Sequence, residues 1–335
     1  MCRQIFLPLV FVAALAPDCA VSEPRIATRG NVVEERGVLW RDPGDIRLRN
    51  LYYGIGGKDH EPRGVMTFEK EDKAGSSPKF TVRDSNGVTW KVKLGIEARP
   101  EVAATRIVWA AGYVTDEDYF MPTLQVQNLP GHLRRGQKLR LPGGTFRDAR
   151  LERKIPGLDS TSWKWKKNAF NGTRELNGLR VLMALINNWD VKDVNNTIYT
   201  SKKTASDKIY VVSDLGASFG SPGLRVPFSK SRGYLQAYQQ SRFVTKVNAE
   251  FVDFAAPARP GLILMFSPVD FVKRTRYRWI GDRIPRDDAH WMGSLLARLS
   301  DGQIRDAFRS AGFAPGEVDG FTSVLRKRIT ELGAL

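Results

Sequence analysis

Residues 187–196, NNWDVKDVNN, restrict the fold of this chain more than any other stretch of its sequence. They follow NGTRELNGLRVLMALINNW, in which apolar residues recur on one helical stripe, so the chain leaves a buried helix and at once presents short polar side chains. Turn chemistry explains the two asparagines at the start, because Asn bonds the backbone where a helix ends. The remaining pattern, Asp190, Lys192 and Asn195 at the spacing D-x-K-x-x-N, predicts a catalytic loop.

A second polar motif follows this loop after one hairpin. TIYT and KIYVVSD flank SKKTASD and predict two paired strands, after which SDLG presents Asp214. Such a hairpin folds Asn195 and Asp214 back to one place. Either motif alone is weak evidence, since both occur by chance in many proteins. Their order, and the helix before them, strengthen the combined pattern.

Phosphoryl transfer needs the groups that these two motifs supply. A carboxylate accepts the proton of the substrate hydroxyl, a cation balances the moving phosphoryl charge, and two oxygen ligands hold Mg²⁺ on the nucleotide phosphates. Asp190 fits the first role, Lys192 the second, and Asn195 with Asp214 the third. The expected cofactors are therefore ATP and Mg²⁺, or Mn²⁺ in its place.

The same chemistry needs a lysine on a strand and a glutamate on the next helix. KFTVRD and VTWKVKL flank an Asn-Gly pair, a strong hairpin signal, and Lys93 lies on the second of these strands. PEVAATRIVWAAGY follows as a helix, and Glu101 in its first turn is the expected ion-pair partner of Lys93. Lys91 and Glu97 are the close alternatives.

A glycine- and serine-rich turn precedes the first of those strands. AGSSPKF offers to phosphate the backbone N–H groups of Gly75, Ser76 and Ser77 and the hydroxyls of the two serines, with Lys79 nearby. GIGG at 54–57 is a competing glycine loop that we rank second. The first loop is therefore the predicted phosphate-binding loop.

Five segments resemble the protein-kinase-like superfamily over roughly residues 70–220: AGSSPKF, GVTWKVKLG, PEVAATR, LINNWDVKDVNN and VVSDLG. The Ser-x-Pro-Lys loop is similar to that of the atypical HipA-type kinases, and the Glu-x-Ala-Ala helix to that of the secreted Golgi-type kinases. The resemblance implies an α+β, two-lobed fold, with a strand-rich N-terminal lobe that carries one key helix, a mainly helical C-terminal lobe, and ATP between them. It also implies that Lys93 binds the α- and β-phosphates.

Three features depart from the superfamily pattern. Asn188-Trp189 stand where His-Arg precedes the catalytic aspartate, Leu215 replaces the phenylalanine of the metal motif, and no Ala-Pro-Glu segment follows. These differences affect substrate class and regulation more than nucleotide binding. The role of Trp189 is left unexplained.

The first 22 residues have the pattern of an export signal. A single Arg3 precedes IFLPLVFVAALA, an apolar stretch too short to span a bilayer, and Ala20-Val21-Ser22 offers a cleavage site. The mature chain is then expected in the periplasm or outside the cell, without a transmembrane span. We expect three parts: a signal peptide at 1–22, an N-terminal lobe at 23–155 and a C-terminal lobe at 156–335.

Both cysteines, Cys2 and Cys19, lie in or beside this leader, so a mature chain would contain no disulfide. Lipid attachment through Cys19 is the minor alternative, because Pro17-Asp18 before it fits a lipobox poorly. An uncleaved anchor or a misassigned start codon is another.

The formal net charge of +16 attracts polyanions, among them nucleotides, acidic proteins, anionic lipids and nucleic acids. The sequence lacks an aromatic RNA-binding motif and zinc-finger spacing, which argues against nucleic-acid binding. The expected partners are a nucleotide and an unidentified phospho-acceptor, for which an acidic protein is one candidate.

Two function classes follow from these observations. The complete set of motifs favours an atypical kinase, which transfers the γ-phosphoryl group of ATP to a hydroxyl of a protein or another acceptor. Export to a space poor in ATP favours the alternative, a non-catalytic, secreted, pseudokinase-like envelope protein that binds nucleotide or an acidic partner.

Overall fold

The computed structural model describes residues 36–335 apart from 74–76, 202–206, 222–230 and 256–267. The described residues belong to one compact unit, Glu35–Leu335. The expected signal peptide, both cysteines, and Gly75 and Ser76 of the expected phosphate loop lie outside the described residues. Within the described part, no helix combines the length and the hydropathy that crossing a membrane requires.

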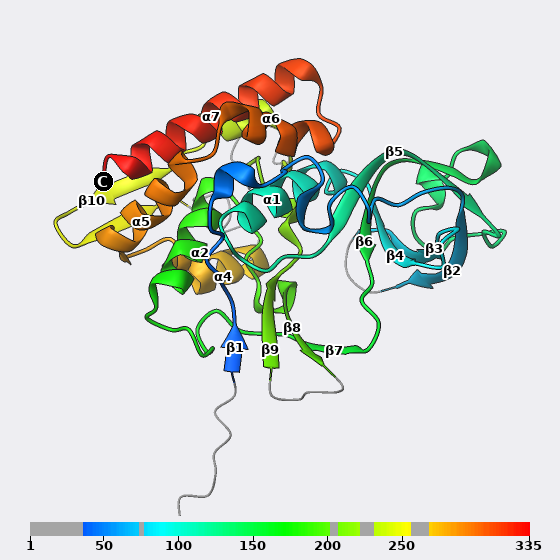
Figure 1. Cartoon of the computed structure of the whole chain (residues 1–335), viewed down its shortest axis with the longest axis horizontal. Coiled ribbons are helices and arrows are strands. Elements are labelled where there is room, and N and C mark those ends of the chain that lie inside the picture. The colour runs from blue at the N-terminus through cyan, green and yellow to red at the C-terminus, as the bar shows by residue number, and fades with distance from the viewer. Residues whose placement is uncertain (1–35, 74–76, 202–206, 222–230, 256–267) are drawn as a thin grey trace, which may run out of the picture. The chain divides into compact units, whose positions relative to one another are not determined.

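A closed five-stranded barrel forms the N-terminal lobe (Figure 1). Neighbouring strands pair antiparallel except at the closure, where the first and last strands in barrel order pair in parallel. The predicted hairpin around the Asn-Gly pair is confirmed, with Val82 opposite Trp90. In barrel order the strands are β2 (Met66–Asp72), β3 (Lys79–Arg83), β4 (Thr89–Leu94), β6 (Thr145–Arg153) and β5 (Asp118–Gln127).

Side chains alternate along each strand, so apolar residues point into the barrel and charged residues point outward. Trp90, Val92 and Leu94 on β4 point into a core shared with aromatic and aliphatic residues of the other strands. Lys93 lies on the opposite face of the strand yet is only 2% exposed, because α1 (Ala98–Ala110) packs against β5 and β6 there. A charge on the outside of the barrel is therefore buried beneath a helix.

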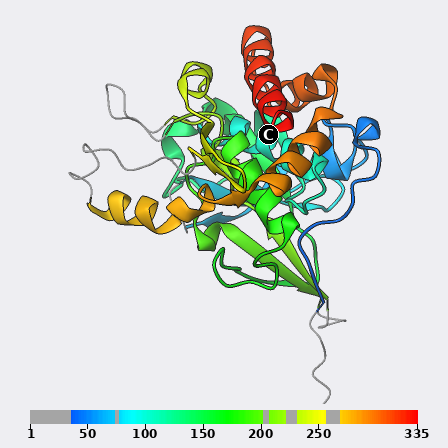
Figure 2. The same ribbon diagram turned by 90° about the vertical axis from the view of Figure 1, so that its left-hand side faces the viewer.

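The C-terminal lobe is mainly helical, and its helices share one core with α1. α5, α6 and α7 lie side by side in Figures 1 and 2, drawn in orange to red. Thr173 caps the central helix, since its hydroxyl accepts the N–H of Leu176 at 3.2 Å. The helices are α2 (Arg174–Leu185), α3 (Leu235–Gln240), α4 (Pro268–Tyr277), α5 (Arg286–Ala297), α6 (Asp301–Ser310) and α7 (Pro315–Gly333).

Two small sheets complete the architecture. One has the order β1-β9-β8-β7, and its antiparallel pair β8–β9 confirms the hairpin predicted between the two polar motifs. The other has the order β10-β11-β12. Their strands are β1 (Arg36–Val38), β7 (Leu158–Thr161), β8 (Asn196–Ser201), β9 (Asp207–Val212), β10 (Val244–Val247), β11 (Phe251–Phe254) and β12 (Ile284–Pro285).

The predicted fold class is confirmed. A strand-rich lobe with one key helix precedes a mainly helical lobe, and α1 contacts elements of both. The lobe boundary expected near residue 155 stays a prediction.

Candidate active site

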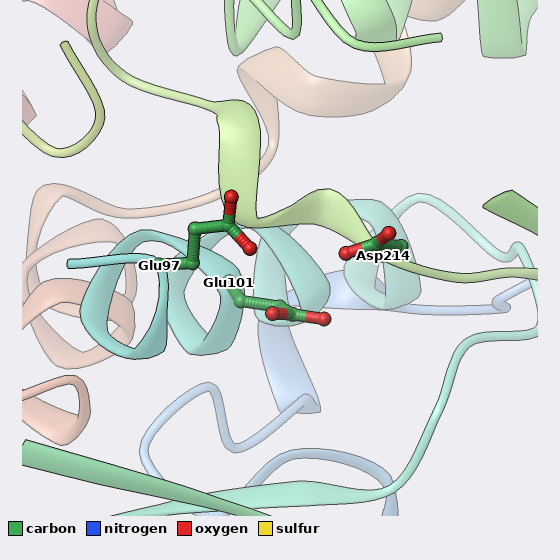
Figure 3. A group of neighbouring side chains, drawn as sticks. All are labelled: Glu97, Glu101 and Asp214. Atoms are coloured by element: carbon green, nitrogen blue, oxygen red, sulfur yellow. The ribbon is translucent and has the colours of Figure 1, made fainter. Parts of the chain in front are cut away.

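Lys93 lies at the centre of a cluster of three carboxylates. Its Nζ is 2.7 Å from Glu101 Oε2, 2.6 Å from Asp214 Oδ1 and 2.9 Å from Glu97 Oε2. Figure 3 shows the two glutamates on α1 and Asp214 on the neighbouring turn, with their carboxylates directed at a common space. Burial disfavours the charged amine, but the three carboxylates outweigh it and raise the pKa of Lys93 above its ordinary value. Lys93 is therefore held as a cation.

Both of the glutamates that the sequence offered contact Lys93, but their surroundings differ. The second oxygen of Glu101, Oε1, forms an ion pair with Arg150 at 3.0 Å, and the side chain of Glu101 is 1% exposed. Glu97 lies nearer the surface, where its Oε1 pairs with Arg232 Nε at 2.8 Å and its Oε2 accepts the hydroxyl of Ser77 at 2.9 Å. Lys93 is thus shared between an inner and an outer glutamate.

Arg150 was not singled out from the sequence, although it holds the inner part of the site together. It stands directly across the strand pair from Lys93, at the matching position of β6. Besides Glu101 it contacts Asp118 at 3.3 Å and Glu152 at 2.9 Å. Because the side chain is buried and touches only carboxylates at these distances, it balances their charge and fixes the direction of Glu101. The arginine and glutamate of FRDARLER, two residues apart on one strand face, were the available signal.

Lys79 and Lys91 occupy different positions around the cluster. Lys79 pairs with Lys93 across β3 and β4. Burial and the charge of Lys93 lower the pKa of Lys79, while Asp214 acts in the opposite direction. Lys91, the alternative strand lysine, instead lies 3.7 Å from Glu152. Lys93, and not Lys91, therefore contacts the glutamates of α1.

The competing glycine loop at 54–57 has a packing explanation. A Cβ at Gly54 would lie 2.3 Å from the guanidinium of Arg106, and one at Gly56 would lie 2.2 Å from the hydroxyl of Tyr119. Both glycines therefore allow the backbone to approach bulky side chains closely.

The predicted catalytic residues gather around Asp190. Lys192 Nζ lies 2.7 Å from Asp190 Oδ2, and Asn195 Nδ2 donates to the backbone carbonyl of Asp190 at 2.6 Å. The N–H of Asp190 donates to Asn188 Oδ1 at 2.9 Å. The turn that ends the helix and the loop that presents Asp190 are thus the same structure.

Trp189 connects this loop to the segment after Asp214. Its indole N–H donates to Ser231 O at 3.2 Å, and its backbone N–H donates to Ala217 O at 3.3 Å. The guanidinium of Arg232 lies 4.8 Å from the ring centroid, within the range of a cation–π contact. The same Arg232 pairs with Glu97, so Trp189 links the loop of Asp190 to the carboxylates around Lys93.

The turn after β9 brings Asp214 to the cluster at a conformational cost. Asp214 has φ 52° and ψ 50°, in the left-handed region, immediately before the short helix η6 (Leu215–Ala217). Gly216 within η6 faces α1, where a Cβ would lie 2.8 Å from Glu97 Cβ and 3.0 Å from Glu101 Oε2. The glycine of SDLG is therefore required by the close approach of α1.

The expected metal ligands are compatible with a hard cation. Asn195 uses its amide nitrogen toward Asp190, so its Oδ1 is the atom suited to a metal, and Asp214 Oδ2 is the oxygen not engaged by Lys93. Asn196 pairs with Val212 across β8 and β9, which brings the ends of the two strands together. Glu97, Glu101 and Asp214 also have carboxylate oxygens within 4.8 Å of one another. Lys93 Nζ already lies among these three, so they form an ion-pair cluster.

The ionisation of Asp214 makes a pH-dependent contribution to the unfolding free energy of the chain. Burial raises the pKa of Asp214, but Lys93 lowers it more, and the result falls from 3.8 to about 2. A depressed folded-state pKa means that the contribution is present above pH about 4 and is lost as pH falls toward about 2. We expect the difference in unfolding free energy between the wild-type chain and Asp214→Asn to shrink across this window, as measured by urea unfolding.

The control for this prediction is the same comparison made in a Lys93→Met background. Removing the cation removes the main cause of the depressed pKa, so the difference should then change little between pH about 4 and about 2. A difference that stays constant over this window in the wild-type background would contradict the role given to Lys93.

Comparisons with known proteins give similarities in structure only. No protein-family profile matches the chain, and no curated protein matches its sequence. Among solved structures it is similar to CtkA, a proinflammatory kinase of Helicobacter pylori, with a TM-score of 0.45 and 9% identity over 81% of this chain and 97% of that one. It is also similar to the Golgi casein kinase with Mn and ADP bound, with a TM-score of 0.43 and 9% identity over 82% of this chain and 72% of that one.

These similarities are too distant to assign an activity, and the likeness to HipA-type kinases stays a prediction from the sequence. The chain's own topology and its ion pairs define the fold. A five-stranded barrel carries a lysine paired to a helix glutamate, and a hairpin brings the aspartate of SDLG to the same lysine. This arrangement is a two-lobed, kinase-like fold, and its assignment to an atypical branch stays a prediction from the sequence.

Proposed function

We propose that this chain is an ATP-dependent phosphotransferase that transfers the γ-phosphoryl group to a hydroxyl of an acceptor. One observation carries the proposal: Lys93 Nζ lies 2.7 Å from Glu101 and 2.6 Å from Asp214. Lys93 and Glu101 come from a strand and the helix that follows it, whereas Asp214 lies on a turn 121 residues from Lys93. Packing alone does not require these three charges to meet, whereas nucleotide phosphates and their metal need a cation and a carboxylate at one place.

Each residue of the site has a role in this chemistry. Lys93 would orient the nucleotide phosphates. Glu101 would fix the position of Lys93, and Arg150 would fix the position of Glu101. Asn195 and Asp214 would hold Mg²⁺ or Mn²⁺, which neutralises charge on the phosphates when bound. Asp190 would accept the proton of the acceptor hydroxyl as that oxygen attacks the γ-phosphorus.

Lys192 and Asp190 act as a pair in this proposal. The 2.7 Å contact between them would place a cation beside Asp190 and the transferred group. The acceptor class is open: a hydroxyl of a protein, sugar or lipid satisfies the same geometry. The net charge of +16 favours an acidic acceptor protein.

Nucleotide binding gives the first measurable consequence. Ligand at about 100 times its dissociation constant stabilises the folded state by about 2.7 kcal/mol. We expect ATP with Mg²⁺ to raise the thermal unfolding midpoint of residues 23–335 by several degrees, and Lys93→Met to abolish the shift. Lys91→Met is the matched control, because Lys91 lies on the same strand as Lys93 but contacts Glu152 of β6. No shift with any nucleotide would contradict the proposal.

Labelled ATP then separates catalysis from binding. Transfer of label to an added acceptor, or to the chain itself, supports the phosphotransferase. A nucleotide-dependent thermal shift without transfer to any acceptor supports the alternative, a non-catalytic protein that keeps the fold to bind nucleotide. The export signal expected at residues 1–22 is the sequence feature that favours this alternative.

A further inference from the structure

A cavity of about 440 Å³ lies beside the start of α1. Its walls come from the start of α1, the 138–148 segment before and within β6, the start of α7, and Arg232 with Gly233. This volume is typical of a small-ligand site. The site proposed for phosphoryl transfer leaves this cavity without a role.

The charges that line the cavity favour an anion. Four cationic side chains face two carboxylates there, those of Asp148 and Glu317. Asp148 is already engaged by Arg99 at 2.9 Å. Lys138 and Arg147 are exposed and stand at the mouth. The four cationic side chains are Arg99, Lys138, Arg147 and Arg232.

Apolar side chains line the remainder of the cavity. Ile96 is 68% exposed, Leu139 40% and Leu141 38%, so three large exposed hydrophobic residues surround one cavity. Pro100 and Phe313 add apolar surface. Single exposed hydrophobic residues are normal on a protein surface, but a group of them beside a ligand-sized cavity marks a binding surface. The combination suits a ligand with an apolar body and a negative charge.

Arg232 joins the cavity to the candidate active site. Its Nε lies 2.8 Å from Glu97 Oε1, and Glu97 Oε2 lies 2.9 Å from Lys93 Nζ. An anion bound in the cavity would compete with Glu97 for Arg232. Glu97 would then hold Lys93 more strongly or move with Arg232, and in either case the charge available to the nucleotide phosphates changes.

We infer that this cavity is a second binding site, for a small amphipathic anion, and that its occupancy is coupled to Lys93 through Arg232 and Glu97. The binding site stands independently of the proposed function. The coupling rests on the proposed function, because it is a change in nucleotide affinity.

Anilinonaphthalene sulfonate, an apolar anion whose fluorescence rises on binding, is the probe. We expect saturable binding to the folded chain, weakened at least about tenfold by Lys138→Glu combined with Arg147→Glu, since each removes an attraction and adds a repulsion. The matched control combines Lys246→Glu with Lys327→Glu, which makes the same change in net charge at exposed positions outside the cavity. The control should bind the probe as the wild-type chain does.

Three results would overturn the site: no saturable binding, equal losses in the cavity and control variants, or a loss of probe binding in Lys93→Met as large as in the cavity double variant. The last would place the probe in the nucleotide site. Ile96→Ser is a second cavity variant. Ile96 is exposed enough for the substitution to leave folding unaffected, and the lost apolar contact should weaken probe binding several-fold.

The coupling has its own readout. Saturating probe should change the nucleotide dissociation constant at least about threefold in the wild-type chain and leave it unchanged in Arg232→Gln. An unchanged constant in the wild-type chain would overturn the coupling. A chain that binds the probe at the cavity but binds no nucleotide would contradict the proposed function while supporting the second site.

Discussion

Replacing Asp190 by asparagine is expected to lower the rate of phosphoryl transfer by about 10²–10⁴-fold while nucleotide affinity changes little. Asparagine keeps the size of the side chain and a partner for Lys192, but its amide cannot accept the proton of the acceptor hydroxyl. The loop itself is built from contacts of the backbone of Asp190, which donates to Asn188 and accepts from Asn195. The substitution therefore removes one chemical group and leaves the loop in place.

The measurement is the rate of label transfer from ATP at saturating nucleotide, together with the nucleotide-dependent shift in thermal unfolding. Asp59→Asn, at an exposed position away from the loop, is the matched control and should keep the wild-type rate. A transfer rate within about threefold of wild type would remove Asp190 from the role of base. A loss of nucleotide affinity as large as the loss of rate would show that the substitution disturbs the site as a whole.

Replacing Arg150 by methionine is expected to lower the unfolding free energy by about 3–5 kcal/mol. Methionine keeps most of the length and apolar volume of the side chain but leaves the buried Glu101 and Asp118, and the half-buried Glu152, without the cation that all three contact. Breaking a buried ion pair on one side costs more than the pair contributes, because a charge remains out of water. Urea unfolding monitored by tryptophan fluorescence measures the loss.

Arg153→Met is the matched control on the same strand. Arg153 contacts Glu117 at 3.7 Å from a side chain that is 30% exposed, so its loss should cost about 1 kcal/mol or less. Equal losses for the two variants would contradict the role given to Arg150. We also expect Arg150→Met to weaken nucleotide binding, because Glu101 loses the contact that directs it at Lys93.

Much of the architecture could be predicted from local sequence. The Asn-Gly hairpin, the helix that ends just before Asn187 and the β8–β9 hairpin each depend on residues close together in the chain, and each is observed. The two-lobed fold was predicted from the resemblance of five segments to the protein-kinase-like superfamily. The grouping of Lys192 and Asn195 around Asp190 also follows from spacing, since all three lie within one short loop.

The roles of the two glutamates could not be decided in this way. Glu97 and Glu101 are four residues apart, at the start of α1 and one turn on, and lie on the same side. A lysine side chain can reach either, so spacing does not choose between them. The packing of α1 on the barrel allows Lys93 to contact both, and Arg150 and Arg232 then separate an inner glutamate from an outer one.

The sequence by itself determined the elements, their order and the polar residues of each loop, because hydrophobic periodicity and turn chemistry act over a few residues. Only the tertiary structure decided that Arg150 lies across from Lys93, that Trp189 packs against Arg232, and that Glu97 is shared. Apart from the pair Lys93 and Glu97, four positions apart, these contacts join residues tens of positions apart. They depend on strand register and on the distance between a helix and a barrel, where a shift of one residue turns a side chain to the opposite face.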